Sequence, residues 1–337
     1  MPSPAPTERQ ERDGLLLAAA AAILYGAAYP ATAIALRSFT PLAIAGLACT
    51  LALPVVIALG ATGVLPRPSR AAMHPPNLVR LAVLGGLGGI GFIALVNVAV
   101  SLSGSTVTGF IAPLYAVAAA LLAVPILGER LRLVTLAAFA LAIIGTVLLA
   151  GGVPNGEALA GILLAAAAAA MFGLYIVLAR RWAGRYHLDA TLITVATLIG
   201  RGPMLLAIEV VRSDGALWPA SPDPAAVVAL LTIAFGSSSS ANLLLMASVR
   251  RVAAGRASAA LLLTPVSSAI IGAVLLHEVL TPVELLGAAM VLAGIAVASG
   301  LLDRWLAVRR GDRGDSVGEI VPIDPSGLDP GANGPPR

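Results

Sequence analysis

The sequence contains no lysine, one cysteine and few charged residues of any kind. Charged residues make up 11% of the chain and hydrophobic residues 58%, whereas a soluble globular chain carries about 25% charged residues. Such a chain cannot bury its apolar surface in a water-soluble core, so we expect an integral membrane protein. The lone Cys49 excludes an intramolecular disulfide and argues against a thiolate metal site. The absence of lysine excludes a P-loop, whose motif requires one.

Apolar runs recur along the chain at about 20 residues, the length that crosses a bilayer as a helix. Only helices and closed barrels satisfy backbone polar groups inside lipid, and these runs lack the short alternation of barrel strands. We therefore predict an all-α integral membrane protein. Its ten transmembrane helices are expected at residues 15–36, 42–60, 81–101, 106–127, 133–151, 159–179, 192–211, 225–247, 257–276 and 283–302.

Arginine supplies every basic side chain and indicates how the chain crosses the membrane. With the N-terminus in the cytoplasm, 18 of the 21 arginines lie on the cytoplasmic side, Arg37 and Arg212 lie outside, and Arg201 lies within a span. Cytoplasmic enrichment of positive charge is the usual sorting rule. The split predicts a multi-pass protein of the cell inner (plasma) membrane with both termini cytoplasmic. The net charge of +4 then requires no nucleic-acid partner.

The stretch around the fifth span occurs twice. Adding 149 to a residue number takes Glu129 to Glu278 and Gly145 to Gly294. A charge and a helix-weakening residue that recur at fixed spacing in apolar sequence indicate a duplication. Because each copy holds an odd number of spans, the second copy must be inserted upside down. Inverted repeats around a central site are the architecture of many secondary transporters.

The duplication divides the chain into two repeats flanked by polar ends. We expect a disordered cytoplasmic head at residues 1–14, five-helix repeats at 15–152 and 153–302, and a disordered cytoplasmic tail at 303–337.

Three short motifs occur in both halves. They are Tyr25-Gly26 and Phe172-Gly173 in the first helix of each half, Leu127-Gly128-Glu129 and His277-Glu278 at the end of the fourth, and Gly145 and Gly294 in the fifth. In these motifs the chain resembles the EamA-type branch of the drug/metabolite transporter (DMT) superfamily. The resemblance implies a ten-helix inverted-repeat permease, often an exporter of amino acids or other small metabolites.

Arg201 lies in the middle of a predicted span, between two glycines and just before Pro203. A central arginine costs about 2.5–3.5 kcal/mol on insertion scales, so it should face a polar interior or a partner. One hypothesis is that Arg201 anchors a carboxylate-bearing substrate. The alternatives are an ion pair with Glu209, or a position near the interface.

The two repeated glutamates, Glu129 and Glu278, each lie where one helix ends and the next begins. A carboxylate there can cap backbone N–H groups and complement the dipole of the next helix. We favour this structural interpretation over a proton-coupling role, for which a deeper position is expected.

Polar side chains within the spans are candidates for a substrate cavity. Helix-breaking prolines, Pro113 and Pro265, free backbone carbonyls beside several of them. The alternative for all of them is hydrogen bonding between helices. The candidate lining residues are Tyr29, Asn97, Tyr115, Arg201, Ser238, Ser239, Asn242, Thr264 and Ser267.

Other chemistry finds little support. The G-x-G-x-x-G match at residues 86–91 lies inside a predicted span rather than between a strand and a helix, so it does not indicate a dinucleotide site. The three histidines have no metal-ligand spacing, and we expect no metal and no cofactor. All aspartates fall in predicted loops or tails, which argues against a membrane-embedded enzyme.

The leading hypothesis is a secondary transporter, an exporter of small organic metabolites that works by alternating access around a cavity between the repeats. Its partners would be a small-molecule substrate, the bilayer and a coupling proton or other ion. The alternative is a flippase of a lipid-linked substrate on the same scaffold. The sequence leaves the substrate, the coupling ion and the oligomeric state open.

Overall fold

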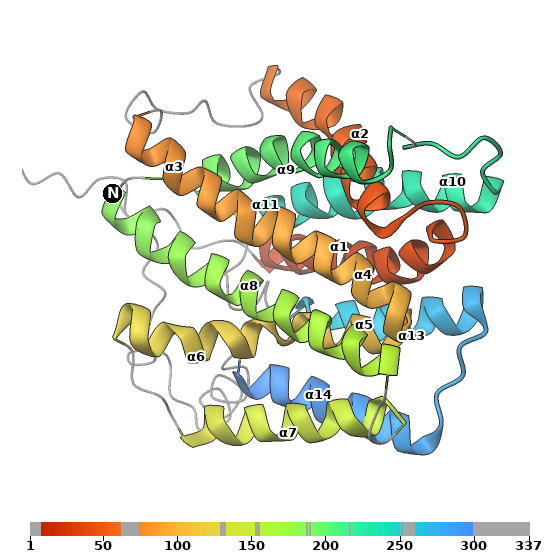
Figure 1. The fold of residues 1–337 in the computed structure, drawn as a ribbon. Helices are drawn as coiled ribbons and strands as arrows, with labels where there is room; N and C mark the ends of the chain where they lie inside the picture. Colours follow the sequence, from red (N-terminus) through yellow and green to blue (C-terminus); the bar gives the residue numbers. More distant parts are fainter. Residues whose placement is uncertain are drawn as a thin grey trace, which may run out of the picture.

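The computed structural model describes residues 8–61, 74–128, 133–151, 156–186, 188, 190–215, 217–249, 251 and 260–298. Within these ranges every regular element is a helix, and Figure 1 shows how they stack. The elements of the first half are α1 (Glu8–Ala35), α2 (Pro41–Ala61), α3 (Pro75–Leu84), η2 (Gly85–Gly91), α4 (Phe92–Ser103), α5 (Ser105–Ile111), η3 (Ala112–Leu114), α6 (Tyr115–Leu127) and α7 (Leu133–Leu149). Those of the second half are α8 (Gly156–Tyr186), α9 (Ala190–Arg212), α10 (Pro224–Leu231), η4 (Thr232–Ala241), α11 (Asn242–Val249), α13 (Leu263–Leu276) and α14 (Pro282–Ala298).

Among the described residues, five helices are long and apolar enough to cross a membrane: Arg9–Ala35, Pro75–Ser103, Ser105–Leu127, Gly156–Trp182 and Pro224–Leu245. Shorter apolar helices cover Pro41–Val55, Leu136–Leu149, Leu263–Leu276 and Pro282–Val297. One expected boundary is wrong: α1 begins at Glu8, so residues 8–14 are helical rather than part of a disordered head. The expected tail at 303–337 lies outside the described residues.

The ends of α6 and α13 share one conformation at repeat-related positions. Gly128 (φ 73°) and His277 (φ 56°), which differ by the 149-residue offset, both cap their helices in the left-handed region. Glycine adopts this region at no steric cost, whereas other residues, with histidine among the more tolerant, adopt it uncommonly. The Gly-Glu and His-Glu motifs therefore mark the same helix stop in both halves.

The first helix of each half crosses the fourth helix of the other half. A Cβ on Gly26 of α1 would lie 2.7 Å from Cβ of Ser267 in α13, and one on Gly173 of α8 would lie 2.8 Å from Cβ of Ala118 in α6. The 149-residue offset takes Ala118 to Ser267. The repeated aromatic-Gly motif thus places a glycine where two helices approach too closely for a side chain.

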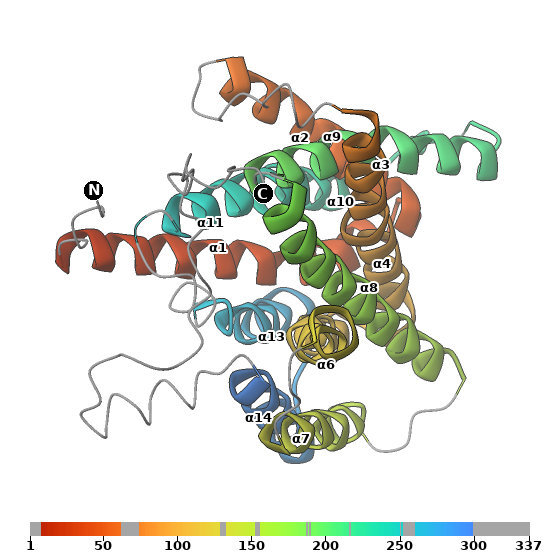
Figure 2. The ribbon, with the colours of Figure 1, turned by 90° about the vertical axis from the view of Figure 1, so that its left-hand side faces the viewer.

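The fifth helix of each half, α7 or α14, packs against its counterpart, and the two lie side by side in Figures 1 and 2. A Cβ on Gly145 would lie 2.7 Å from the carbonyl oxygen of Gly287, and one on Gly294 would lie 2.8 Å from that of Ala138. Residue numbers therefore rise in α7 as they fall in α14, so the helices are antiparallel. The offset that relates Gly145 to Gly294 also relates Ala138 to Gly287, so exchanging the halves reproduces the contact.

The second helices, α2 and α9, form a similar antiparallel pair. A Cβ on Gly46 would lie 2.8 Å from Cδ2 of Leu206, and one on Gly202 would lie 2.8 Å from Oγ1 of Thr50. Around these crossings, α1 also contacts η4 and α11, as α8 contacts η2 and α4. Since each of these contacts has its counterpart in the other half, the two halves interlock around a shared interior.

Candidate functional site

A cavity of about 620 Å³ occupies this interior, within the range of about 300–1,000 Å³ that small-molecule sites span. Both halves line it: α1, α2, η2, α4, η3 and α6 from the first, and α8, α9, η4, α11 and α13 from the second. Among the described residues, neither α7 nor α14 contributes a lining residue. The α7–α14 pair therefore joins the two halves away from the cavity, which lies where the other helices cross.

Aromatic side chains from three helices form one wall of the cavity. The ring of Phe172 lies 4.6 Å from that of Phe92 and 4.9 Å from that of Tyr115, centroid to centroid. Phe92 and Tyr115 meet edge to face at 6.4 Å. Tilted and edge-to-face contacts of this kind are the favoured geometries for aromatic pairs. The cluster, here called the aromatic wall, joins α4 and α6 of one half to α8 of the other.

A hydrogen bond between the halves crosses the cavity lining. The Tyr25 hydroxyl donates to Oδ1 of Asn242 at 3.0 Å, and both residues line the cavity. The Asn242 amide nitrogen donates at 3.1 Å to the carbonyl oxygens of Ser237 and Ser238. These serines lie in the π-helical segment η4, and π-helical turns are frequent at functional sites. Asn242 therefore satisfies backbone groups beside the irregular turn and also ties it to α1.

The counterpart of η4 in the first half is η2, and both π-helical segments line the cavity. A Cβ on Gly88 would lie 2.6 Å from the ring of Tyr175, and a Cβ on Gly91 would lie 2.3 Å from Cε of Met171. The G-x-G-x-x-G stretch therefore packs against α8.

Arg201 lines the cavity from α9 and is 9% exposed. Its Nε is buried with no hydrogen-bond partner, and among the described residues no carboxylate forms an ion pair with its guanidinium. The guanidinium lies within electrostatic reach of the Tyr25 hydroxyl. The alternative ion pair with Glu209 does not form, because the Glu209 carboxylate binds Thr40 and Arg212 instead.

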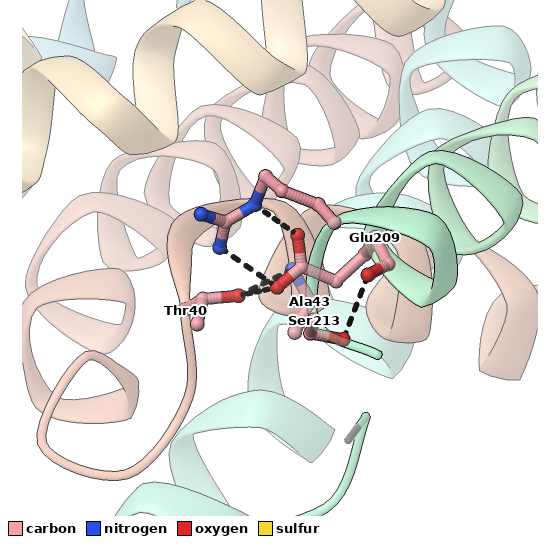
Figure 3. A network of polar contacts seen from close by, with 5 residues as sticks. Thr40, Ala43, Glu209 and Ser213 are labelled. Carbon is pink, nitrogen blue, oxygen red and sulfur yellow. Dashed lines mark hydrogen bonds and ion pairs between the residues drawn. The ribbon is translucent and has the colours of Figure 1, made fainter. Parts of the chain in front are cut away.

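Glu209 is the centre of a polar network beyond the cavity, shown in Figure 3. Its fully buried carboxylate accepts from the hydroxyl of Thr40 and from Nε and Nη2 of Arg212, at 2.8 and 3.0 Å for the two nitrogens. Thr40 also caps α2, because its Oγ1 accepts from the backbone N–H of Ala43 at 3.2 Å. The network therefore joins the start of α2 in one half to the end of α9 in the other.

Two more contacts join the two halves at the same end of the molecule. The backbone N–H of Asp223 donates to the Ser38 hydroxyl at 2.9 Å, and the Phe39 ring meets the Trp218 ring edge to face at 5.1 Å. At the other end the cavity reaches Leu127, the last residue of α6, and the exposed Arg180. Contacts between the two halves thus gather at the Glu209 end, and the lining includes an exposed residue at the Arg180 end.

The structure brings together most of the sequence-predicted site residues. Those that line the cavity are Tyr29, Asn97, Pro113, Tyr115, Arg201, Ser238, Asn242 and Thr264. Pro265, Ser239 and Ser267 are buried outside the lining. The Ser239 hydroxyl donates to the carbonyl of Ala234 at 3.0 Å, and Ser267 packs against Gly26 of α1.

The two repeated glutamates lie away from the cavity lining or outside the described residues. Glu278 accepts from the Ser105 hydroxyl at 2.8 Å and from the Thr106 hydroxyl, at the first turn of α5. A carboxylate at a helix N-terminus is favoured by the helix dipole. Glu129 lies outside the described residues.

Several lining residues were missed by sequence reasoning. They are Tyr25, Thr32, Cys49, Phe92, Phe172, Arg180 and Ser237. The sequence offered a way to predict two of them, because Tyr25 and Phe172 are the aromatic residues of the repeated aromatic-Gly motif. Because the glycine faces the neighbouring helix, the residue before it is turned toward the interior.

The fold and site define a class: a helical membrane protein built from two related halves that enclose a small-molecule cavity. A model of the EamA-like transporter family matches the chain twice, at residues 12–151 and 159–300. The chain therefore belongs to the EamA-like transporter family. A solved crystal structure of another protein is similar at a TM-score of 0.61 and 23% identity, covering 88% of this chain and 99% of that one, which shows a shared fold. A search of the curated proteins finds no match.

Proposed function

We propose that this protein is a secondary transporter that exports small organic metabolites by alternating access. The cavity between the two halves supports this proposal, because contacts join the halves at its Glu209 end and the exposed Arg180 lines its other end. A cavity that opens to one side at a time is what an alternating-access carrier requires.

We further propose that the helical segments make ten membrane crossings as two inverted repeats. The antiparallel pairing of α7 with α14 and of α2 with α9 supports this, since related helices run in opposite directions. The helices α7 and α14 have 17 residues each, at the short end of the range of about 17–25 residues that span a bilayer.

The orientation follows from the arginines. We place both termini in the cytoplasm of a cell whose inner (plasma) membrane holds the protein, because 18 of the 21 arginines then lie inside. Arg180 marks the cytoplasmic end of the cavity, and Arg212 marks the outer end. The structure is then open to the cytoplasm, as the substrate-accepting state of an exporter should be.

Counterflow in proteoliposomes tests the proposal. Purified protein is reconstituted, loaded with unlabelled solute, and supplied with labelled amino acids, organic acids, nucleosides or cationic drugs, with and without an imposed pH gradient. Exchange of any of these solutes supports a carrier, and acceleration by the gradient identifies proton coupling. If folded protein exchanges none of them but moves lipid-linked headgroups between leaflets, the protein is a flippase.

A further inference from the structure

We propose that the cavity selects organic anions, with a carboxylate bound at Arg201 and an aromatic body against the aromatic wall. This inference rests on the proposed function and adds the substrate class. It combines two features that lie in one cavity: an unpaired buried cation and a cluster of aromatic rings.

The charged side chains that line the cavity are all positive among the described residues. Among the described lining residues there are two arginines, Arg180 and Arg201, and no aspartate, glutamate or histidine. Arg180 is exposed and has interactions of its own, whereas Nε of the buried Arg201 has no partner. A buried charge is normally paired or functional. Arg201 is therefore available to bind an anion, since the described residues provide no carboxylate for it.

Carboxylate suits this position for geometric reasons. A guanidinium presents its N–H donors in a planar fork that matches a carboxylate with two parallel hydrogen bonds. The neighbouring Tyr25 hydroxyl is already used, because it donates to Asn242. Arg201 is thus the group in the cavity that is both charged and unoccupied.

Arg201 and the aromatic wall face the same cavity. Arg201, Tyr25 and Tyr115 all line it, and Tyr25 interacts electrostatically with both Arg201 and Tyr115. Tyr115 belongs to the wall, together with Phe172 and Phe92. A ligand that fills this cavity therefore meets both a cation and aromatic rings, which favours a molecule that carries a carboxylate and a flat ring.

The same arrangement disfavours substrates with an ammonium group. A cation would meet the uncompensated charge of Arg201, and the described lining offers no carboxylate to pair with it. A zwitterion would satisfy Arg201 and leave its ammonium without an ionic partner. We therefore expect the order anion, then zwitterion, then neutral isostere, then cation.

Four indole compounds test this order because they share one ring and differ in charge. These are indole-3-acetate (anion), tryptophan (zwitterion), indole-3-acetamide (neutral) and tryptamine (cation). Binding to purified full-length protein is measured by isothermal titration calorimetry. Indole-3-acetate should bind about 10- to 100-fold more tightly than its amide, the range expected for one charged hydrogen-bonded pair. Acetate, which lacks the ring, should bind more weakly than indole-3-acetate.

The variant Arg201→Gln should lose that preference, so that indole-3-acetate and its amide bind alike, whereas Arg201→Lys should retain part of it. The matched control is Arg251→Gln, which removes an exposed arginine that does not line the cavity. Unchanged thermal unfolding shows that each variant is folded. If Arg201→Gln is unstable, the order of the four compounds on the wild-type protein still decides the proposal.

The inference is overturned if folded wild-type protein binds none of the indole compounds, binds tryptamine or the amide as tightly as the carboxylate, or if folded Arg201→Gln keeps the preference. These results differ from a failure of the proposed function. A carrier that exchanges only cations or neutral solutes in counterflow remains a transporter without the anion site. Tight carboxylate binding without exchange keeps the anion site and removes the carrier.

Discussion

In the orientation proposed above, Glu209 links the two halves at the outer end of the cavity through Thr40, and we expect its replacement to open that end. The variant Glu209→Gln keeps an acceptor for the Thr40 hydroxyl but makes this link between α2 and α9 a neutral hydrogen bond, whereas the contact with Arg212 lies within α9 and does not join the halves. A hydrogen bond to a charged group is worth about 1.5–3 kcal/mol and a neutral one about 0.5–1.5 kcal/mol, so we expect a loss of about 1.5 kcal/mol between the halves.

A loss of about 1.5 kcal/mol from the inward-open state shifts its equilibrium with the outward-open state about tenfold. The native protein carries its own reporter of this shift. Cys49 is the only cysteine in the chain and lines the cavity. In vesicles with the outer face exposed, a membrane-impermeant thiol reagent should modify Cys49 about tenfold faster in Glu209→Gln than in the wild type.

The matched control is Asp214→Asn, which removes an exposed carboxylate two residues beyond Arg212 and suits the local backbone, since asparagine tolerates the φ of 49° found there. This variant should react like the wild type. The same rate of outer modification in Glu209→Gln and in the wild type, or an equal rise in Asp214→Asn, would refute the gating argument.

Two further changes test the packing and the role of Glu278. In Gly26→Ala the new Cβ would lie 2.4 Å from the carbonyl oxygen of Thr264, so we expect a loss of about 1–3 kcal/mol from overpacking, whereas Gly200→Ala, with nothing within 4 Å, should be neutral or stabilising. Thermal unfolding in detergent measures both, and equal stabilities would contradict the close crossing of α1 and α13. Glu278→Gln weakens the interactions with Ser105 and Thr106 and should lower thermal stability by about 1–3 kcal/mol. It should leave the pH profile of counterflow unchanged, and a pH optimum that vanishes in this variant would instead assign Glu278 to proton coupling.

Much of the architecture could be predicted because duplication leaves marks in the sequence. The offset that relates Gly145 to Gly294 also relates Gly128 to His277, and these residues hold equivalent places at a helix crossing and at a helix stop. Such positions tolerate few side chains for steric reasons. They therefore stand out even in a chain rich in leucine and alanine.

The candidate site was predicted less completely because a polar residue in a span can face either the cavity or a neighbouring helix. Ser238 lines the cavity while the next residue, Ser239, bonds to the backbone of its own helix. The wider π-helical turn of η4 changes the direction of successive side chains, which regular helical spacing does not anticipate.

The ion pair between Arg201 and Glu209, considered from the sequence, could have been tested against helix geometry. Glu209 lies eight residues along α9, about 12 Å at 1.5 Å per residue. Arg212, three residues from Glu209, is on the adjacent turn. Helical spacing alone therefore favours the pair that forms and leaves Arg201 to the cavity.

The central claim is that the cavity between the two halves is the path of transport, and Cys49 allows a direct test. Counterflow of the solute that exchanges fastest is measured before and after Cys49 is modified with a bulky maleimide, in the wild type and in Cys49→Ala. We expect modification to block exchange in the wild type and to have no effect on Cys49→Ala, because the alanine variant leaves the cavity open. Undiminished exchange by wild-type protein whose Cys49 is fully modified would contradict it.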